Sequence, residues 1–193
     1  LPMGGNYPII GGTFYDYKLG NGNFMINELN MNKQKLIVTG KATLVVNNSF
    51  NMAGSSSITI APGGTLKLYI ACNNASIGGN GIINNAGYAT NCIIYGTPNC
   101  QSITVGGNGT FIGALYAPQA ALTLQGGGSA FEDFMGAAVV KSAQINGHFK
   151  FHYDEALRFR GPPKGFIVIA WNEMAPADMQ APVIDCSDSG VIY

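Results

Sequence analysis

From about residue 36 onward, the chain is a succession of short apolar runs that Gly, Asn, Ser or Pro interrupts at close intervals. Short runs rich in Ile, Val, Leu and Thr, bounded by turn residues, are typical of β-strands. Before residue 130 no stretch repeats its apolar residues with a helical period. The chain is therefore predicted to be all-β until near its end, with strands at 36–38, 43–46, 57–60, 65–70, 75–77, 81–83, 92–95, 102–105, 110–112, 114–117, 121–124, 136–140 and 143–146.

Many short strands fit two architectures, a β-sandwich or barrel and a β-solenoid. A weak internal repeat favours the solenoid, because residues 76–82 (SIGGNGI) resemble residues 104–110 (TVGGNGT). Repeats of about 20 to 50 residues indicate stacked structural units. Small uncharged side chains also suit a solenoid, since each turn stacks like residues on like. We therefore expect a single-stranded β-helix, or β-solenoid.

Charged residues are scarce and unevenly placed. The 193 residues include 10 Lys and Arg and 10 Asp and Glu, which gives a net charge of zero. Lys67 is the one charged residue between Lys41 and Glu132, and no carboxylate lies between Glu28 and Glu132. This balance argues against a nucleic-acid partner, which selects for excess Lys and Arg. The middle of the chain also lacks the groups that acid–base catalysis requires, and no cofactor motif is present.

The chain is divided by composition into three parts. Residues 1–35 carry several Tyr and Phe among Gly and Asn, and we expect an N-terminal cap or first rung there. Residues 36–160 form the predicted β-helix, which ends in a short helix over 155–159 with Asp154 as its N-cap. Residues 161–193 form a C-terminal strand and tail, with the strand at 166–171. Trp171 and the N-terminal tyrosines are predicted to pack in these end regions.

Four cysteines bear on the cellular compartment. They are Cys72, Cys92, Cys100 and Cys186, and none forms a CxxC pair, so the spacing fits no zinc motif. An even count in a chain with few charges indicates secretion, with a disulfide within the group Cys72, Cys92 and Cys100. The alternative is four buried free thiols. No apolar run approaches the roughly 20 residues that span a bilayer, and the start at Leu1 without a signal pattern predicts a mature product or a fragment.

The order of motifs in the second half resembles a known family. Residues 109–124 (GTFIGALYAPQAALTL) precede a Gly126-Gly-Gly step, then 136–141 (GAAVVK) and 147–157 (GHFKFHYDEAL). This order is similar to bacterial β-helical domains of uncharacterised function in exported surface proteins and PilX-like type IV pilus assembly proteins. The resemblance covers roughly residues 36–173 and is most specific over 109–157.

The resemblance implies a right-handed β-helix, an extracellular or cell-surface location and a non-enzymatic role as a rigid structural or adhesive module. It implies no catalytic residues. The partners it implies are proteins of a surface or pilus assembly, or further copies of the chain, and possible glycans. We expect no nucleic-acid partner and no membrane insertion by this segment.

One cluster could bind a metal ion. His148, His152 and Asp154 share parity, so a strand would place them on one face, where they could hold a divalent ion. The alternative is a solvated polar face opposite the aromatic residues that alternate with them. The turns at 78–81 and 106–109 (both GGNG) are predicted to be structural, because a phosphate-binding loop would continue into Lys, Ser or Thr and a helix.

Two further readings concern polysaccharides. A glycosidase typically needs two carboxylates about 5 to 10 Å apart, but this chain places no carboxylate on the central strands, and we expect no enzyme. Binding to a glycan or another ordered surface, such as ice, would use outward threonines, which strand alternation predicts at Thr59, Thr104 and Thr123. The acidic candidates for the enzymatic alternative are Glu132, Asp133, Asp154 and Glu155.

Overall fold

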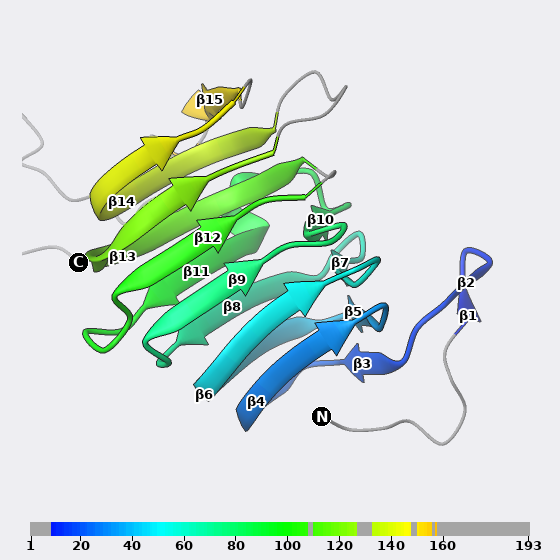
Figure 1. Ribbon diagram of the computed structural model, residues 1–193. Helices are drawn as coiled ribbons and strands as arrows, with labels where there is room; N and C mark the ends of the chain where they lie inside the picture. Colours follow the sequence, from blue (N-terminus) through cyan, green and yellow to red (C-terminus); the bar gives the residue numbers. More distant parts are fainter. Residues whose placement is uncertain (1–8, 108–109, 127–132, 148–149, 156, 158–193) are drawn as a thin grey trace, which may run out of the picture. The chain divides into compact units, whose positions relative to one another are not determined.

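The chain folds as a parallel β-solenoid of about six turns, with 65% of the described residues in strands and almost no helix among them (Figure 1). This computed structural model describes residues 9–107, 110–126, 133–147, 150–155 and 157. The described residues all belong to one compact unit, Leu1–Phe159. The predicted all-β solenoid is confirmed. No helix among the described residues is long and apolar enough to cross a membrane.

Two sheets form the walls of the solenoid, and a short hairpin precedes them. The antiparallel hairpin is β1 (Ile9–Ile10) with β2 (Thr13–Phe14). The four-stranded sheet has the order β10 (Ile82–Asn84), β7 (Ser57–Ile60), β5 (Lys35–Val38), β3 (Tyr17–Leu19). The nine-stranded sheet contains β4 (Gly22–Asn32), β6 (Lys41–Ala53), β8 (Thr65–Ile70), β9 (Asn74–Ile77), β11 (Cys92–Gly96), β12 (Ser102–Val105), β13 (Phe111–Leu124), β14 (Phe134–Ile145) and β15 (Phe151–Tyr153).

Long strands join two faces of the larger sheet. The first half of β6 pairs with β8 and its second half with β9, and β13 pairs in the same way with β11 and β12. All these pairs are parallel. Figure 1 accordingly shows β4, β6, β9, β12, β13 and β14 side by side, with β8 and β11 behind them. Each long strand therefore presents outward residues on two different faces.

Apolar columns fill the interior, because in-register stacking brings every second residue of a strand over its counterpart in the next turn. Leu44, Leu68, Ile94 and Leu115 form one such column and are all buried. Each fully buried aliphatic side chain contributes about 1.5–3 kcal/mol. The alternation that predicted strands in the sequence is thus the alternation between core and surface.

Buried and half-buried polar side chains link neighbouring turns through hydrogen bonds to the backbone. Asn84 Nδ2 donates to the carbonyl oxygens of Tyr88 (2.8 Å) and Ile112 (3.0 Å). Near the two ends of the described solenoid, an Asp that directly precedes a strand accepts from the backbone N–H of the residue beside it. Asp16 Oδ2 accepts from Lys35 N (2.7 Å), and Asp133 Oδ2 accepts from Lys150 N (2.8 Å).

The two ends of the solenoid differ in how many of their residues the structure describes. β3 and β4 pair in parallel with β5 and β6, so parallel stacking starts within residues 1–35. At the other end, Leu157 N donates to Asp154 O (3.1 Å) at the start of the predicted helix over 155–159, most of which lies outside the described residues. The predicted strand at 166–171, Trp171 and Cys186 also lie outside them.

Candidate functional site: an uncharged face of the solenoid

The second halves of the long strands, with β9 and β12 between them, carry a continuous row of uncharged polar side chains. Parallel register places one member in each of six successive turns, and all six are exposed or half-buried. We call this row the polar column; its members are Asn30, Asn51, Ser76, Thr104, Thr123 and Gln144. Ser49, in the row beside the column, donates from its Oγ to Asn30 Oδ1 (2.8 Å). Within that neighbouring row, Ser102 Oγ donates to Asn74 Oδ1 of the preceding turn (2.7 Å).

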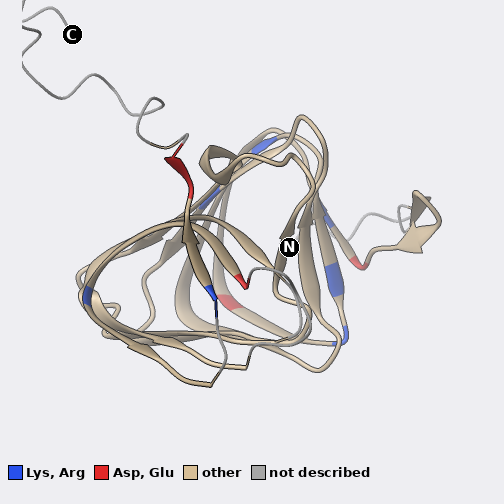
Figure 2. Cartoon of the chain, turned by 90° about the horizontal axis from the view of Figure 1, so that it is seen from above, with Lys and Arg blue, Asp and Glu red and all other residues tan. Residues whose placement is uncertain are grey.

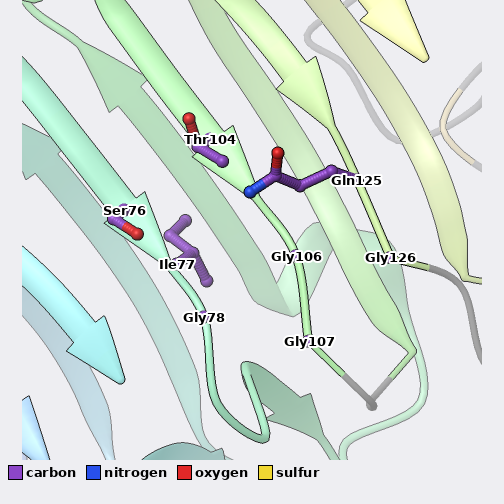
Figure 3. Close-up of a pocket in the computed structure, with 8 residues that line it drawn as sticks. All are labelled: Ser76, Ile77, Gly78, Thr104, Gly106, Gly107, Gln125 and Gly126. Carbon is purple, nitrogen blue, oxygen red and sulfur yellow. The ribbon is translucent and has the colours of Figure 1, made fainter. Parts of the chain in front are cut away.

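A groove of about 400 Å³ lies along the polar column at its middle turns (Figure 3). Glycines create it, because the positions that follow the column in two neighbouring turns are Gly78 and Gly106, which have no side chain. The Gln125 side chain borders Gly106 from the next turn. Every residue that lines the groove is uncharged: Ser76, Ile77, Gly78, Thr104, Gly106, Gly107, Gln125 and Gly126.

The glycine corner beside the groove is a close backbone contact. Gly79 and Gly107 occupy it in successive turns with φ of +67° and +110°, a region that favours glycine. A Cβ on Gly107 would collide with the carbonyl oxygen of Gly79. The GGNG turns that the sequence marked therefore serve, over their described residues, as tight corners of stacked turns.

Apart from Glu28, whose carboxylate accepts from Asn30 Nδ2 (3.2 Å) in the first turn, the chemistry open to this face is that of neutral hydrogen bonding. Hydroxyl and amide side chains both donate and accept, so they suit hydroxyl or amide groups of a ligand. Figure 2 shows only scattered charged residues on the solenoid wall. Among the described members and lining residues, none supplies a general acid, a general base or a charged anchor.

The structure brings together two of the three threonines that alternation predicted as outward. Thr104 and Thr123 are register partners on β12 and β13 and belong to the polar column. The expectation for Thr59 is corrected: it lies in β7 on the other sheet and is 5% exposed. Residues of the N-terminal segment explain this burial, because Thr13 and Tyr15 line the same cavity as Thr59.

Sequence reasoning missed a second outward row on the first halves of the long strands. This row, the apolar column, consists of Met25, Val45, Tyr69, Tyr95, Tyr116 and Val139. The rings of Tyr69 and Tyr95 stack with centroids 4.8 Å apart, and Tyr116 is 50% exposed. The only signal in the sequence was a tyrosine near the end of three predicted strands, and turns of unequal length concealed that the three tyrosines share one register.

The acidic and metal-ligand candidates are not brought together in the part that the structure describes. His152 is exposed on β15 and Asp154 is half-buried just after it, whereas His148 lies outside the described residues. Over those residues no group of three or more His, Cys, Asp or Glu could hold a metal ion. Asp133 is buried and bonded to backbone, Glu155 is exposed, and Glu132 is not described. The metal site stays a prediction.

The three described cysteines are free thiols and all are buried. The disulfide predicted within Cys72, Cys92 and Cys100 is therefore not seen. Desolvation by burial raises the pKa of the Cys92 thiol to about 12 and that of Cys100 to about 11. An adjacent Cys72 charge also raises the pKa of Cys100. At neutral pH these thiols are protonated and poor nucleophiles.

The fold and the polar column define a parallel β-solenoid with a row of uncharged polar side chains along one face. The chain belongs to the family of a domain of unknown function, DUF7305, whose family model matches residues 10–159. The matched span contains every described strand from β2 onward and the whole polar column. No curated protein and no solved structure matches the chain.

Proposed function

We propose that the chain is a non-enzymatic structural module of an exported bacterial surface or pilus-related protein. It acts as a rigid scaffold whose polar column adheres to a partner in a surface assembly. Stacked parallel strands supply stiffness, and the uncharged face supplies neutral hydrogen-bonding groups. The resemblance to domains of exported surface and pilus assembly proteins supports the location and the partners.

The observation that carries the proposal is the continuity of the polar column. Six turns place a hydroxyl or amide side chain at the same position, and no charged residue interrupts them. A regular neutral row can meet an extended partner through many weak contacts in line. Catalysis is a poorer fit, because no carboxylate lies between Glu28 and Glu132.

A charge placed in the polar column tests this role. Bead-bound chain is expected to retain intact bacterial cells, and Thr104→Lys should reduce that retention by about tenfold, which corresponds to about 1.4 kcal/mol. The ammonium group would enter a face with no counter-charge among the column members and would lose hydration on contact. Far-UV circular dichroism would check that the variant keeps its strands.

Met25→Lys is the matched control, since Met25 is 71% exposed in the apolar column. We expect it to bind like the unmodified chain. Equal retention by Thr104→Lys, or a loss only with Met25→Lys, would contradict the assignment to the polar column.

A glycan is the second candidate partner, and the groove favours it. Its lining of hydroxyl, amide and backbone groups without charge suits a neutral sugar polymer. Binding to neutral members of a glycan array, lost in Thr104→Lys, would identify this partner. Release of new reducing ends from a polysaccharide by the chain would overturn the non-enzymatic role and establish a polysaccharide-active β-helix.

A further inference from the structure

Cys72 and Cys100 occupy equivalent places in two consecutive turns. Before them, β8 and β11 pair in parallel, and the last pair is Ile70 with Gly96. After them, β9 and β12 pair from Asn74 with Ser102. Each cysteine thus lies two residues before one member of the register pair Asn74 and Ser102. Each thiol also donates to the carbonyl oxygen two residues ahead, from Cys72 Sγ at 3.3 Å and from Cys100 Sγ at 3.8 Å.

The backbone brings the two residues within disulfide range. Gln101 N donates to Asn73 O (2.8 Å), so the inter-turn ladder is re-formed one residue after each cysteine. Neighbouring strands lie about 4.7–4.9 Å apart, and the Cα atoms of disulfides lie about 4.4–6.8 Å apart. Both residues are buried, at 3% and 0% exposed, and both belong to the hydrophobic core of the solenoid.

Cys92 cannot replace either partner. It begins β11, whereas Cys100 follows the turn beyond Gly96, the last residue of that strand. Four strand residues at about 3.3 Å each put Cys92 about 13 Å from Gly96. Cα atoms more than about 7 Å apart are not bridged without movement of the backbone. The register therefore selects one pair among the three described cysteines.

We propose that Cys72 and Cys100 form a disulfide that ties these two turns together as the chain folds in an oxidising compartment. The oxidant is a small disulfide such as oxidised glutathione. One thiolate attacks it and releases one glutathione thiol; the second cysteine then attacks the mixed disulfide and releases the other. The two cysteines lose two protons and two electrons, and the oxidant's S–S bond is reduced to two thiols. This inference does not rest on the role of the polar column.

Burial determines whether the disulfide forms before or after the core closes. The thiolate is the attacking form, and desolvation holds the pKa of Cys100 at about 11 once the core has closed. Oxidation is therefore fast in the open chain and slow in the folded reduced protein. We therefore expect the disulfide to form before the core closes and to be buried once folding is complete.

The test compares two refolding conditions for the full 193-residue chain. Reduced, unfolded chain is refolded either in mixed oxidised and reduced glutathione or in reductant alone, then unfolded, alkylated and digested without reduction. Chymotrypsin is needed, since Tyr88 and Tyr95 separate the three cysteines, whereas trypsin has no site between Lys67 and Lys141. We expect mass spectrometry of the oxidised sample to show a Cys72–Cys100 linked peptide pair, with Cys92 alkylated.

Two readouts keep the proposal falsifiable. Cys92→Ala should retain the link, and the oxidised chain should unfold at a higher urea concentration than the reduced chain, because the bond restricts the unfolded state. A link that contains Cys92 or Cys186, four alkylated cysteines, or an oxidised chain no more stable than the reduced one would overturn the proposal.

Discussion

Gly136→Ala is expected to lower the free energy of unfolding by about 4 kcal/mol or more. Gly136 has a φ of +149° and is the register partner of Gly113 in the preceding turn. A Cβ at residue 136 would collide with the carbonyl oxygen of Gly113, and a Cβ at residue 113 would lie 2.7 Å from the Cys92 carbonyl oxygen. Three successive turns thus approach backbone to backbone, and a methyl group would force them apart.

Gly87→Ala is the matched control for this effect. Gly87 also has a positive φ, of +83°, but nothing lies within 4 Å of a Cβ built on it. It should cost only the left-handed backbone penalty of about 1–2 kcal/mol. Urea unfolding followed by far-UV circular dichroism measures both. Similar costs for the two variants would mean that the turns at Gly113 and Gly136 are not in close contact.

Phe134→Ala is expected to cost about 3–5 kcal/mol. Phe134 is 0% exposed and lies between Phe111 and Phe151 of the neighbouring turns, with ring centroids 4.7 Å away on each side; its ring is tilted by 47° to that of Phe111 and stacked on that of Phe151. The three residues are in register, so the row is a direct product of parallel stacking. Truncation removes two ring contacts and leaves a cavity between turns.

Two variants separate these contributions in the same urea experiment. Phe134→Leu keeps an apolar side chain and should lose about 1–1.5 kcal/mol, in line with the lost ring pairing. Tyr116→Ala removes an outward aromatic ring that is 50% exposed and should cost far less than Phe134→Ala. A cost below about 1 kcal/mol for Phe134→Ala would contradict the burial of Phe134 between its neighbours.

The sequence located most strands because their local pattern is sufficient. The ranges predicted for 57–60, 65–70 and 102–105 match β7, β8 and β12. It divided β13 into three pieces at Gly113 and Pro118, which usually interrupt strands. The structure keeps one ladder there, because Pro118 falls within the register shift between Ala117 and Ala121, where no backbone N–H is needed.

The sequence predicted which side chains point outward, but not which of them come together in one column. Apolar neighbours on both sides predicted outward side chains for Thr104 and Thr123. That Ser76 and Gln144 join them depends on register, which turns of unequal length set and which no local pattern reveals. The tyrosines of the apolar column were missed for the same reason. Likewise, the cysteine count predicted a disulfide, but only register shows that Cys100, and not Cys92, occupies the place equivalent to Cys72 in the next turn.

In-register parallel stacking is the central claim, and nuclear Overhauser contacts across turns test it most directly. The claim predicts amide-to-Hα contacts from the β12 residue Thr104 to its neighbours on both sides, around Ser76 and around Thr123. It also predicts no close Hα–Hα contacts between β9, β12 and β13, because such contacts mark antiparallel pairs. Strong Hα–Hα contacts between these strands, or Thr104 beside residues of only one of them, would contradict the solenoid and the polar column with it.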